Sequence, residues 1–464
     1  MDRRSHHITV GLRNVNHWLI SLAVVAFLWG CNSGTEEKRI ERPASDVVHP
    51  KWSKDAVIYE ANIRQHTEEG TFAAFAKDVP RLKNMGIDII WLMPIHPIGE
   101  KNRKGELGSY YSIKDYKAVN PEFGTTEDFQ ALVNTIHEND MKVIIDWVAN
   151  HTAWDHVWTE SNPEYYTLTE AGGFAPPVAD WEDVIDLNFD NPDLRKEMLD
   201  AMTYWVSEFD IDGYRCDVAE MVPTDFWVNV REQLDAIKPV FLLAEGEEPE
   251  LHEQAFDMTY SWELMHLMRE VAQGEKSLSA IKDMYARDFA RYPDGYYKMN
   301  IITNHDENSW NGTAEEFFGE AQEAWFVFAA TTYGMPLVYS GQESNNTKRL
   351  AFFEKDPIDW SGGYVFNYLY KSLFSLKAAN PALWNGEFGG SLEWISTNAD
   401  DKVLAFKRVK DNHEVVVLIN ISDTAVTFEI DKEYPVMQRI FGGGIITVEK
   451  EQQLAPYRYK VFAK

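Results

Sequence analysis

Acidic side chains stand at the ends of several short apolar runs of this 464-residue sequence, at Asp217, Glu245 and Asp306. Arg215 lies two residues before Asp217, and residues two apart on a strand project to the same face. An adjacent guanidinium keeps a carboxylate ionised and fixes its orientation, as a nucleophilic carboxylate requires. Glu245 directly follows the apolar run VFLLA, and an apolar surrounding favours the protonated form of a carboxyl, which suits it to donate a proton.

An ionised carboxylate beside a protonated one is the arrangement that cleaves a glycosidic bond. Glu247 and Glu248 are close rivals of Glu245 as the proton donor, but Glu245 leaves the apolar run directly. Asp146 also ends an apolar run, and we assign it a structural hydrogen-bonding role rather than a catalytic one. A lone carboxylate at a strand end is more often a helix cap or a loop anchor, so the chemistry requires the three side chains to converge.

Eight short apolar runs alternate with amphipathic stretches of helical period. Near-continuous apolar runs are typical of parallel strands that are covered on both faces. We therefore expect an α/β fold, a (β/α)8 TIM barrel over residues 51–384, with the chemistry at the C-terminal ends of its strands. A doubly wound open sheet is the alternative, but no Gly-rich dinucleotide fingerprint follows any of the runs. The runs begin at Ala56, Asp88, Val143, Gly213, Val240, Phe256, Met299 and Leu337.

The barrel pattern has one long interruption, from about residue 152 to 190, between the third strand and its helix. This stretch is rich in Trp, Tyr, Pro and Gly, and we expect a short excursion over the barrel mouth whose aromatic rings mostly pack together. After about residue 385 the helical period stops, and runs such as Lys402–Val409 and Glu414–Ile421 replace it. Residues 385–464 are therefore predicted to form an antiparallel β-sandwich domain.

The composition is acidic, with 74 acidic and 44 basic residues and a formal charge of −30. This balance argues against a nucleic-acid partner, whose phosphates need clustered Lys and Arg. Two cysteines are too few for a disulfide scaffold or a four-cysteine zinc site. The composition fits a globular enzyme or a protein that binds an uncharged partner.

Residues 1–30 are predicted to be a targeting segment. A basic start precedes the apolar run WLISLAVVAFLW, which is shorter than the roughly 20 residues that span a bilayer. The following Gly-Cys resembles a bacterial lipobox, in which Cys31 would carry the lipid; an ordinary signal peptide with an incidental cysteine is the alternative. Residues 31–50 would form a polar tether. The protein would then be extracytoplasmic, anchored to a bacterial membrane at its periplasmic or cell-surface face.

The motifs resemble those of the α-amylase superfamily, glycoside hydrolase family 13, over essentially the whole chain after the targeting segment. They occur in the family's order, and each falls at an expected strand end or in the loop after it. The segments are SYYSIKDY (Ser109–Tyr116), DWVANH (Asp146–His151), VIDLN (Val184–Asn188), GYRCDVA (Gly213–Ala219), LLAE ending at Glu245, TNHD (Thr303–Asp306) and GMPLVYSGQE (Gly334–Glu343).

The resemblance implies a role for each carboxylate. Asp217 would be the nucleophile, Glu245 the general acid and base, and Asp306 the carboxylate that grips the distorted sugar in the transition state. The implied reaction is double displacement with retention of the α configuration. The implied substrates are α-linked glucans such as starch, maltodextrins or related oligosaccharides.

Four further residues are implied to bind or position the sugar. His151 and His305 would hydrogen-bond the sugar next to the scissile bond, and Arg215 would orient the nucleophile. Tyr111 would be the stacking platform, with Tyr110 as the alternative if the alignment slips by one residue.

The sequence departs from the family at a calcium site. Many α-amylases continue the nucleophile motif with Lys-His, which serves substrate binding and calcium, whereas Ala219-Glu220 stand here after Val218. Asn150 offers a side-chain oxygen for calcium, but the set of partners is incomplete. We therefore expect no cofactor requirement, with structural calcium left as a weak alternative.

Two other functions are compatible with these motifs. A transglycosylase of the same family would pass the glycosyl group to another sugar instead of water. An inactive glucan-binding surface protein is the other alternative, against which the presence of all three carboxylates argues.

The VIDLN segment resembles branches of the family that act on short oligosaccharides, cyclodextrins or α-1,6 bonds. A sugar-binding role confined to residues 385–464 would need exposed tryptophans, for which Trp384 and Trp394 are weak candidates.

Overall fold

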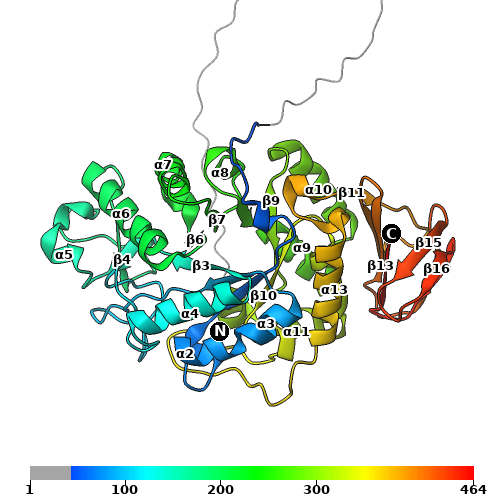
Figure 1. Cartoon of the computed structure of the whole chain (residues 1–464), viewed down its shortest axis with the longest axis horizontal. Coiled ribbons are helices and arrows are strands. Elements are labelled where there is room, and N and C mark those ends of the chain that lie inside the picture. The colour runs from blue at the N-terminus through cyan, green and yellow to red at the C-terminus, as the bar shows by residue number, and fades with distance from the viewer. Residues whose placement is uncertain (1–42) are drawn as a thin grey trace, which may run out of the picture. The chain divides into compact units, whose positions relative to one another are not determined.

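The computed structural model describes residues 43–464, in which eight parallel strands close into a barrel (Figure 1). The strands follow one another around the barrel in chain order, so β10 returns to pair with β1. The predicted (β/α)8 fold is confirmed. The barrel strands are β1 (Ile58–Ala61), β2 (Ile89–Leu92), β3 (Lys142–Trp147), β6 (Gly213–Cys216), β7 (Phe241–Ala244), β8 (Met258–Tyr260), β9 (Tyr297–Asn300) and β10 (Met335–Tyr339).

Helices follow the strands and cover the outside of the barrel (Figure 1). Side chains cap several of these helices. Thr125 forms a capping box with Asp128, and the side chain of Asn191 accepts hydrogen bonds from two backbone amides of the next helix. The main helices are α1 (Ile63–His66), α2 (Phe72–Phe75), α3 (Val79–Met85), α4 (Thr126–Glu138), α6 (Pro192–Phe209), α7 (Thr224–Asp235), α8 (Leu251–Gln254), α9 (Trp262–Ala272), α10 (Ser279–Arg291), α11 (Ala314–Phe318), α12 (Gln322–Thr331) and α13 (Asn367–Ala379).

Strand β9 is shorter and lies earlier than the apolar run from Met299 to Thr303 predicts. Strand β8 ends at Tyr260, which pairs with Met299, so the chain loses that neighbour directly afterwards. Ile301 and Ile302 stay buried but leave the ladder. Asp306 therefore stands on the loop beyond the strand and not at the strand end itself.

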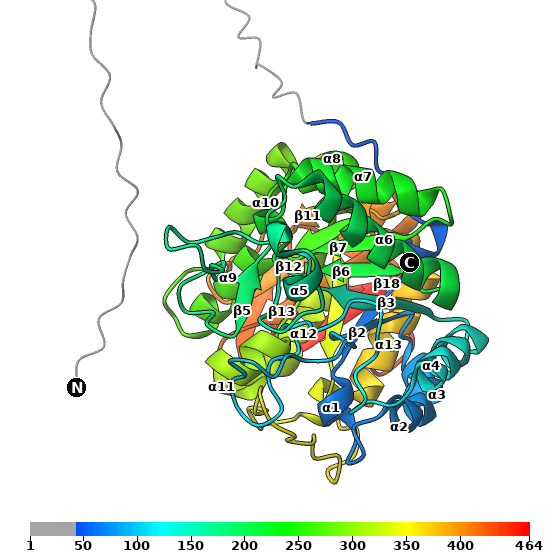
Figure 2. The same ribbon diagram turned by 90° about the vertical axis from the view of Figure 1, so that its left-hand side faces the viewer.

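The excursion after β3 is present as predicted. Strand β4 (His151–Ala153) pairs antiparallel with β5 (Val184–Asp186), and the short helix α5 (Trp158–Ser161) lies between them. Most of its aromatic rings pack together, because Trp158, Tyr165 and Tyr166 are buried. In Figure 2 this excursion, marked by α5 and β5, faces the viewer.

The C-terminal domain consists of two antiparallel sheets that share an apolar core. The larger sheet has the order β11-β12-β13-β18-β15-β16, and β14 pairs with β17 in the smaller one. Arg408, which is fully buried, donates hydrogen bonds to the carbonyls of Thr332 and Gly390, and so ties this domain to the barrel. The strands are β11 (Ser391–Trp394), β12 (Val403–Lys410), β13 (His413–Asn420), β14 (Val426–Glu429), β15 (Tyr434–Arg439), β16 (Ile445–Val448), β17 (Glu451–Leu454) and β18 (Tyr459–Ala463).

The predicted targeting segment, Cys31 and most of the predicted tether lie outside the described residues. The described end of the tether packs on the barrel: Ser45 donates to the carbonyl of His252 at 2.6 Å, and His49 pairs with Asp257 at 2.9 Å. Within residues 43–464, none of the helices has the length and apolar character needed to cross a bilayer.

Candidate active site

One pocket of about 300 Å³ at the barrel mouth is lined by the three candidate catalytic carboxylates. Asp217 directly follows β6, Glu245 directly follows β7, and Asp306 lies on the loop after β9. The C-terminal ends of parallel strands meet at one face of a barrel, so these positions converge although they are far apart in the sequence. The structure thus brings together Asp217, Glu245 and Asp306.

Strand β6 places Arg215 inside the barrel and Tyr214 outside it. Tyr214 donates its hydroxyl to the carbonyl of Met202 on α6, which is the outward direction expected from the alternation of a strand. Arg215 is fully buried below the pocket floor. The same alternation directs Asp217 toward the pocket, two residues further on.

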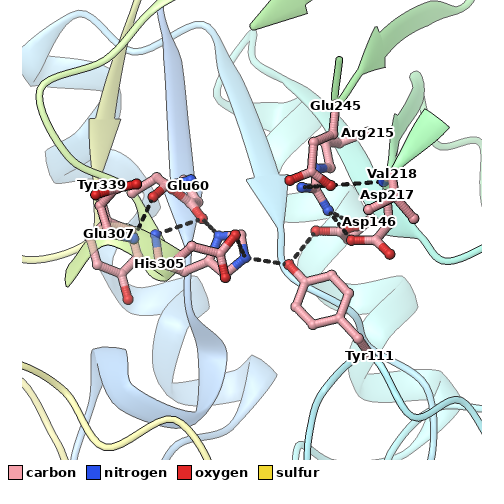
Figure 3. A network of polar contacts seen from close by, with 12 residues as sticks. Glu60, Tyr111, Asp146, Arg215, Asp217, Val218, Glu245, His305, Glu307 and Tyr339 are labelled. Atoms are coloured by element: carbon pink, nitrogen blue, oxygen red, sulfur yellow. Dashed lines mark hydrogen bonds and ion pairs between the residues drawn. The ribbon is translucent and has the colours of Figure 1, made fainter. Parts of the chain in front are cut away.

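The guanidinium of Arg215 holds three carboxylates at once (Figure 3). Its Nη1 lies 2.9 Å from Asp146 Oδ1 and 2.9 Å from Asp217 Oδ1, and its Nη2 lies 2.8 Å from Glu245 Oε2. The two contacts of Nη1 are charged hydrogen bonds, which fix orientation as well as charge, and the contact of Nη2 with Glu245 is an ion pair. Arg215 therefore sets the relative positions of Asp217 and Glu245, and Asp146 braces it from below.

His305 joins the third carboxylate to the rest of the site. Its Nδ1 bonds Glu60, a fully buried residue of β1, and its Nε2 lies 3.2 Å from Asp306 Oδ2 and 2.7 Å from the hydroxyl of Tyr111. Burial opposes protonation of the imidazole, but the charges of Asp306 and Glu60 outweigh it and raise the pKa of His305 to about 9. The ring is therefore an imidazolium near neutral pH.

The pocket holds more carboxylates than cations. Burial raises the pKa of Asp217 well above its usual range, against the opposing charge of Arg215, and burial raises the pKa of Asp146 to about 6. Burial likewise raises the pKa of Asp306. Like charges this close oppose one another's ionisation, so the carboxyls of the cluster titrate as a coupled set. Such a site suits chemistry in which one carboxyl donates a proton and another attacks.

Tyr111 and not Tyr110 faces the pocket. The Tyr111 ring stacks against His305 at 5.4 Å, and its hydroxyl donates to Asp146 at 3.1 Å. Tyr110 turns the other way, with its ring 4.2 Å from the guanidinium of Arg64. Tyr111 therefore lines the pocket, whereas Tyr110 is not among the residues that line it.

His151 also lines the pocket, on the wall formed by the excursion. Its ring meets Trp181 edge to face at 5.4 Å, and burial lowers the pKa of His151 to about 3. A neutral ring of this kind offers a hydrogen bond to a sugar hydroxyl without adding charge. The two histidines of the pocket thus differ in charge.

The candidate calcium ligand lies beside the pocket without a supporting set of acids. The side-chain nitrogen of Asn150 is 3.2 Å from His151 Nδ1. Among residues 43–464, no group of three or more His, Cys, Asp or Glu side chains is placed to hold a metal ion. The residues around Asn150 therefore do not fit a carboxylate-rich calcium site.

Several residues in or beneath the pocket were not predicted from the sequence. Glu60 follows the first apolar run, and the same signal that identifies Glu245 could have found it. Lys104, Asp183 and Phe352 lie on loops and Trp310 lies in the short helical segment Glu307–Asn311, where the sequence pattern gives no sign of which side chains face a pocket.

Comparison with known proteins gives a consistent result. The chain matches the family model "Alpha amylase, catalytic domain" over residues 50–176 and 178–398. Alpha-amylase MalA of Haloarcula japonica is 28% identical over 393 residues, which cover 82% of this chain and 57% of that protein, so the match spans little more than half of that relative. The cyclomaltodextrinase of Thermoanaerobacter pseudethanolicus is 26% identical, with 80% of this chain and 71% of that protein covered.

Solved structures agree with the sequence match. The maltogenic alpha-amylase AmyB of Thermotoga neapolitana superposes with a TM-score of 0.81 and 31% identity, covering 89% of this chain and 99% of that one. An alpha-amylase of Lactobacillus plantarum superposes with a TM-score of 0.80 and 30% identity, and the superposition covers 89% of this chain and 99% of that one. The family match includes every barrel strand and the pocket residues described above. The chain belongs to the alpha-amylase family of glycoside hydrolases.

Proposed function

We propose that the protein is a retaining α-glucoside hydrolase that acts on α-linked glucans by double displacement. The observation that supports this most directly is the contact of Asp217 and Glu245 with one guanidinium. Two carboxyls that contact the same guanidinium lie close together. This fits retaining enzymes, whose catalytic carboxyls are about 5–5.5 Å apart, better than inverting enzymes, whose wider separation admits a water molecule.

In the first step, Glu245 protonates the glycosidic oxygen while a carboxylate oxygen of Asp217 attacks the anomeric carbon. The bond from that carbon to the leaving oxygen breaks, and a covalent glycosyl ester on Asp217 forms. Asp217 must be ionised to attack, and its ion pair with Arg215 favours that ionisation, against burial and the neighbouring carboxylates, which oppose it. The excess of carboxylates favours the positive charge that develops on the sugar in the transition state.

In the second step, Glu245 accepts a proton from a water molecule whose oxygen attacks the anomeric carbon from the vacated side. The ester bond breaks, Asp217 regains its negative charge, and the sugar leaves with its original configuration. Asp306 and the imidazolium of His305 hold the hydroxyls of the distorted ring, and Tyr111 provides a flat surface beside them. His151 binds the same sugar from the excursion side.

The substrate class is supported by the named relatives, among which are alpha-amylases, a cyclomaltodextrinase and a maltogenic alpha-amylase. Starch, maltodextrins and related oligosaccharides share the α-linked glucose that such names imply.

The test is incubation of the purified protein with amylose, pullulan, isomaltose and cyclodextrins, followed by chromatography of the products. Release of glucose or maltose units with α configuration supports the proposal. Products longer than the substrate would favour the transglycosylase alternative, because the glycosyl group would then have passed to a sugar. Binding without any product would favour the inactive glucan-binding alternative.

We also propose that Cys31 carries a lipid that holds the enzyme on a bacterial membrane, outside the cytoplasm. The lipobox-like sequence at residues 28–31 and the polar stretch after it support this proposal. An extracytoplasmic anchor would place the pocket where soluble glucans arrive from the surroundings.

A further inference from the structure

A loop at residues 99–108, which we call the crossing loop, passes over one side of the barrel mouth. It belongs to the connection between β2 and α4, and a β-bridge between Ile98 and Ile113 closes the segment that contains it. Lys104, at the middle of the loop, lines the catalytic pocket. The crossing loop is therefore part of the pocket wall.

The first anchor of the crossing loop is on the excursion. Lys104 Nζ lies 3.1 Å from Asp183 Oδ1 and donates to the carbonyl of Asp180 at 3.0 Å. The amide of Glu100 donates to both carboxylate oxygens of Asp155, at 3.1 Å each. These contacts fix the loop to residues that follow β3.

The second anchor is on the loop after β10. The amide of Leu107 donates to the carbonyl of Phe353 at 3.0 Å, and the amide of Glu106 donates to Glu354 Oε1 at 2.9 Å. Gly105 has a φ of +67°, and a Cβ there would lie 2.4 Å from the Cβ of Phe353. Glycine is thus required both by the backbone conformation and by the close approach of the two loops.

Lys104 separates two hollows. On one side it lines the catalytic pocket, and on the other it lines a second hollow of about 570 Å³ together with Trp154, Pro176 and Glu182. Asp183, its ion-pair partner, is on the pocket side. Lys104 is the one residue that both hollows share, so its side chain and ion pair lie between them, and we refer to them as the wall.

The order of strands shows which end of the pocket this wall closes. The crossing loop and its anchors follow β2, β3 and β10, which lie on the side of the barrel around β1. Glu245 follows β7, on the other side. In a double displacement the acid faces the departing, reducing-end part of the chain. The wall therefore lies toward the sugar that stays on Asp217 and toward the non-reducing end beyond it.

We infer that the crossing loop, through Lys104, closes the pocket at its non-reducing end, so that the enzyme removes short units from chain ends and does not cut within long chains. This inference rests on the proposed hydrolase function and specifies the mode of its action. A chain that continued past the wall would have to displace Lys104 from Asp183 and from the carbonyl of Asp180. A chain end needs no such displacement.

The experiment compares two forms of maltoheptaose, one with a free non-reducing end and one with that end blocked by a 4,6-O-ethylidene group. Chromatography gives kcat/KM for consumption of each. The parent enzyme is expected to consume the blocked form roughly tenfold or more slowly, a ratio that one well-defined steric exclusion supplies. Lys104→Ala is expected to bring the two values closer by opening the wall into the second hollow.

Two variants of matched chemistry serve as controls. Lys104→Met keeps a long side chain without its charge, and is expected to discriminate more like the parent than Lys104→Ala does. Lys101→Ala removes a lysine of the same loop whose ammonium lies over Trp154 at 5.4 Å, away from the pocket, and is expected to leave the ratio unchanged. Thermal unfolding of each variant shows whether the fold is retained.

The outcomes separate this inference from the proposed function. If the parent enzyme consumed both forms at the same rate, the inference would be overturned while the hydrolase function stood. If it consumed neither form, the hydrolase function would fail and the inference with it. If discrimination persisted undiminished in a folded Lys104→Ala protein, Lys104 would not be the wall.

Discussion

The backbone amide of Val218 donates a hydrogen bond of 2.7 Å to Glu245 Oε2. Val218 has a φ of 36°, which is a strained conformation for a β-branched residue. Because Val218 directly follows Asp217, one short segment both carries the candidate nucleophile and positions the candidate acid. Strain of this kind persists where surrounding contacts enforce it, and here it aims an amide at a reacting group.

Replacing Glu245 by Gln should remove the proton that the leaving oxygen requires. We expect turnover of maltooligosaccharides to fall roughly 10²–10⁴-fold, the range that general acid catalysis contributes. α-Maltosyl fluoride should be much less affected in its first step, because fluoride leaves without a proton. Glu232→Gln, on the exposed face of α7, is the matched control. An equal loss with both substrates would assign Glu245 another role.

Replacing Asp217 by Asn should abolish formation of the glycosyl ester. We expect kcat to fall roughly 10⁴-fold or more, as for other residues that act as a unit with their partners. Thermal unfolding and circular dichroism should show that the variant folds, since Asn keeps the shape of the side chain. Asp225→Asn, whose side chain is 72% exposed, controls for the substitution itself. A variant with turnover near that of the parent would rule out Asp217 as the nucleophile.

The barrel could be predicted because buried parallel strands leave near-continuous apolar runs, and because those runs were each followed by a helical period. The catalytic candidates could be predicted from charge at the ends of the same runs. The strand boundaries could be predicted less accurately. The apolar run from Met299 to Thr303 extends beyond the end of β9 at Asn300, because β8, with which β9 pairs, ends at Tyr260 opposite Met299. An apolar pattern indicates that residues are buried but not that they belong to a strand. Ile302, for example, is buried but lies outside β9.

Features set by loops and by weakly apolar strands could not be predicted. Strands β11, β15 and β17 could not be predicted, because their residues are largely polar or exposed, as in the sequence EQQL of β17. The crossing loop reads as an ordinary charged, glycine-containing loop. Its role depends on which residues of the excursion and of the loop after β10 it meets, and such contacts leave no periodic signal in the sequence.

Removal of divalent metal ions should leave the activity unchanged. Ala219-Glu220 stand where related sequences carry Lys-His, and residues 43–464 contain no group of three or more His, Cys, Asp or Glu side chains placed to hold a metal ion. Activity on maltooligosaccharides before and after dialysis against a chelator checks this, with recovery on added calcium as the second measurement. A loss that calcium restores would reveal a metal site that the described residues do not suggest.

Replacement of Cys31 by Ser should release the enzyme from membranes. A lipid attached through the sulfur cannot form on a serine side chain, whereas the folded enzyme should be unaffected. Fractionation of cells that express each form, followed by activity measurement in the soluble and membrane fractions, checks this. Unchanged fractionation would favour the ordinary signal peptide as the correct interpretation.

Replacement of Glu60 by Gln should change how stability and activity depend on pH. In the folded protein the pKa of His305 is raised from 6.5 to about 9, with Glu60 and Asp306 as the charges that raise it. A raised pKa stabilises the fold fully below about pH 6.5, and this stabilisation is lost as the pH rises through about 9. A glutamine side chain at this position would keep the volume of the glutamate but remove one of the two charges.

We therefore expect Glu60→Gln to lose stability most at and below pH 6.5, with the difference from the parent shrinking toward pH 9. The alkaline limb of kcat/KM should also move to lower pH, because the imidazolium of His305 would lose its proton sooner. Urea unfolding and rate profiles from pH 5 to 10 measure both effects, and Glu138→Gln, at the exposed end of α4, is the control. A variant that lost stability equally at every pH would show that Glu60 serves packing rather than the charge of His305.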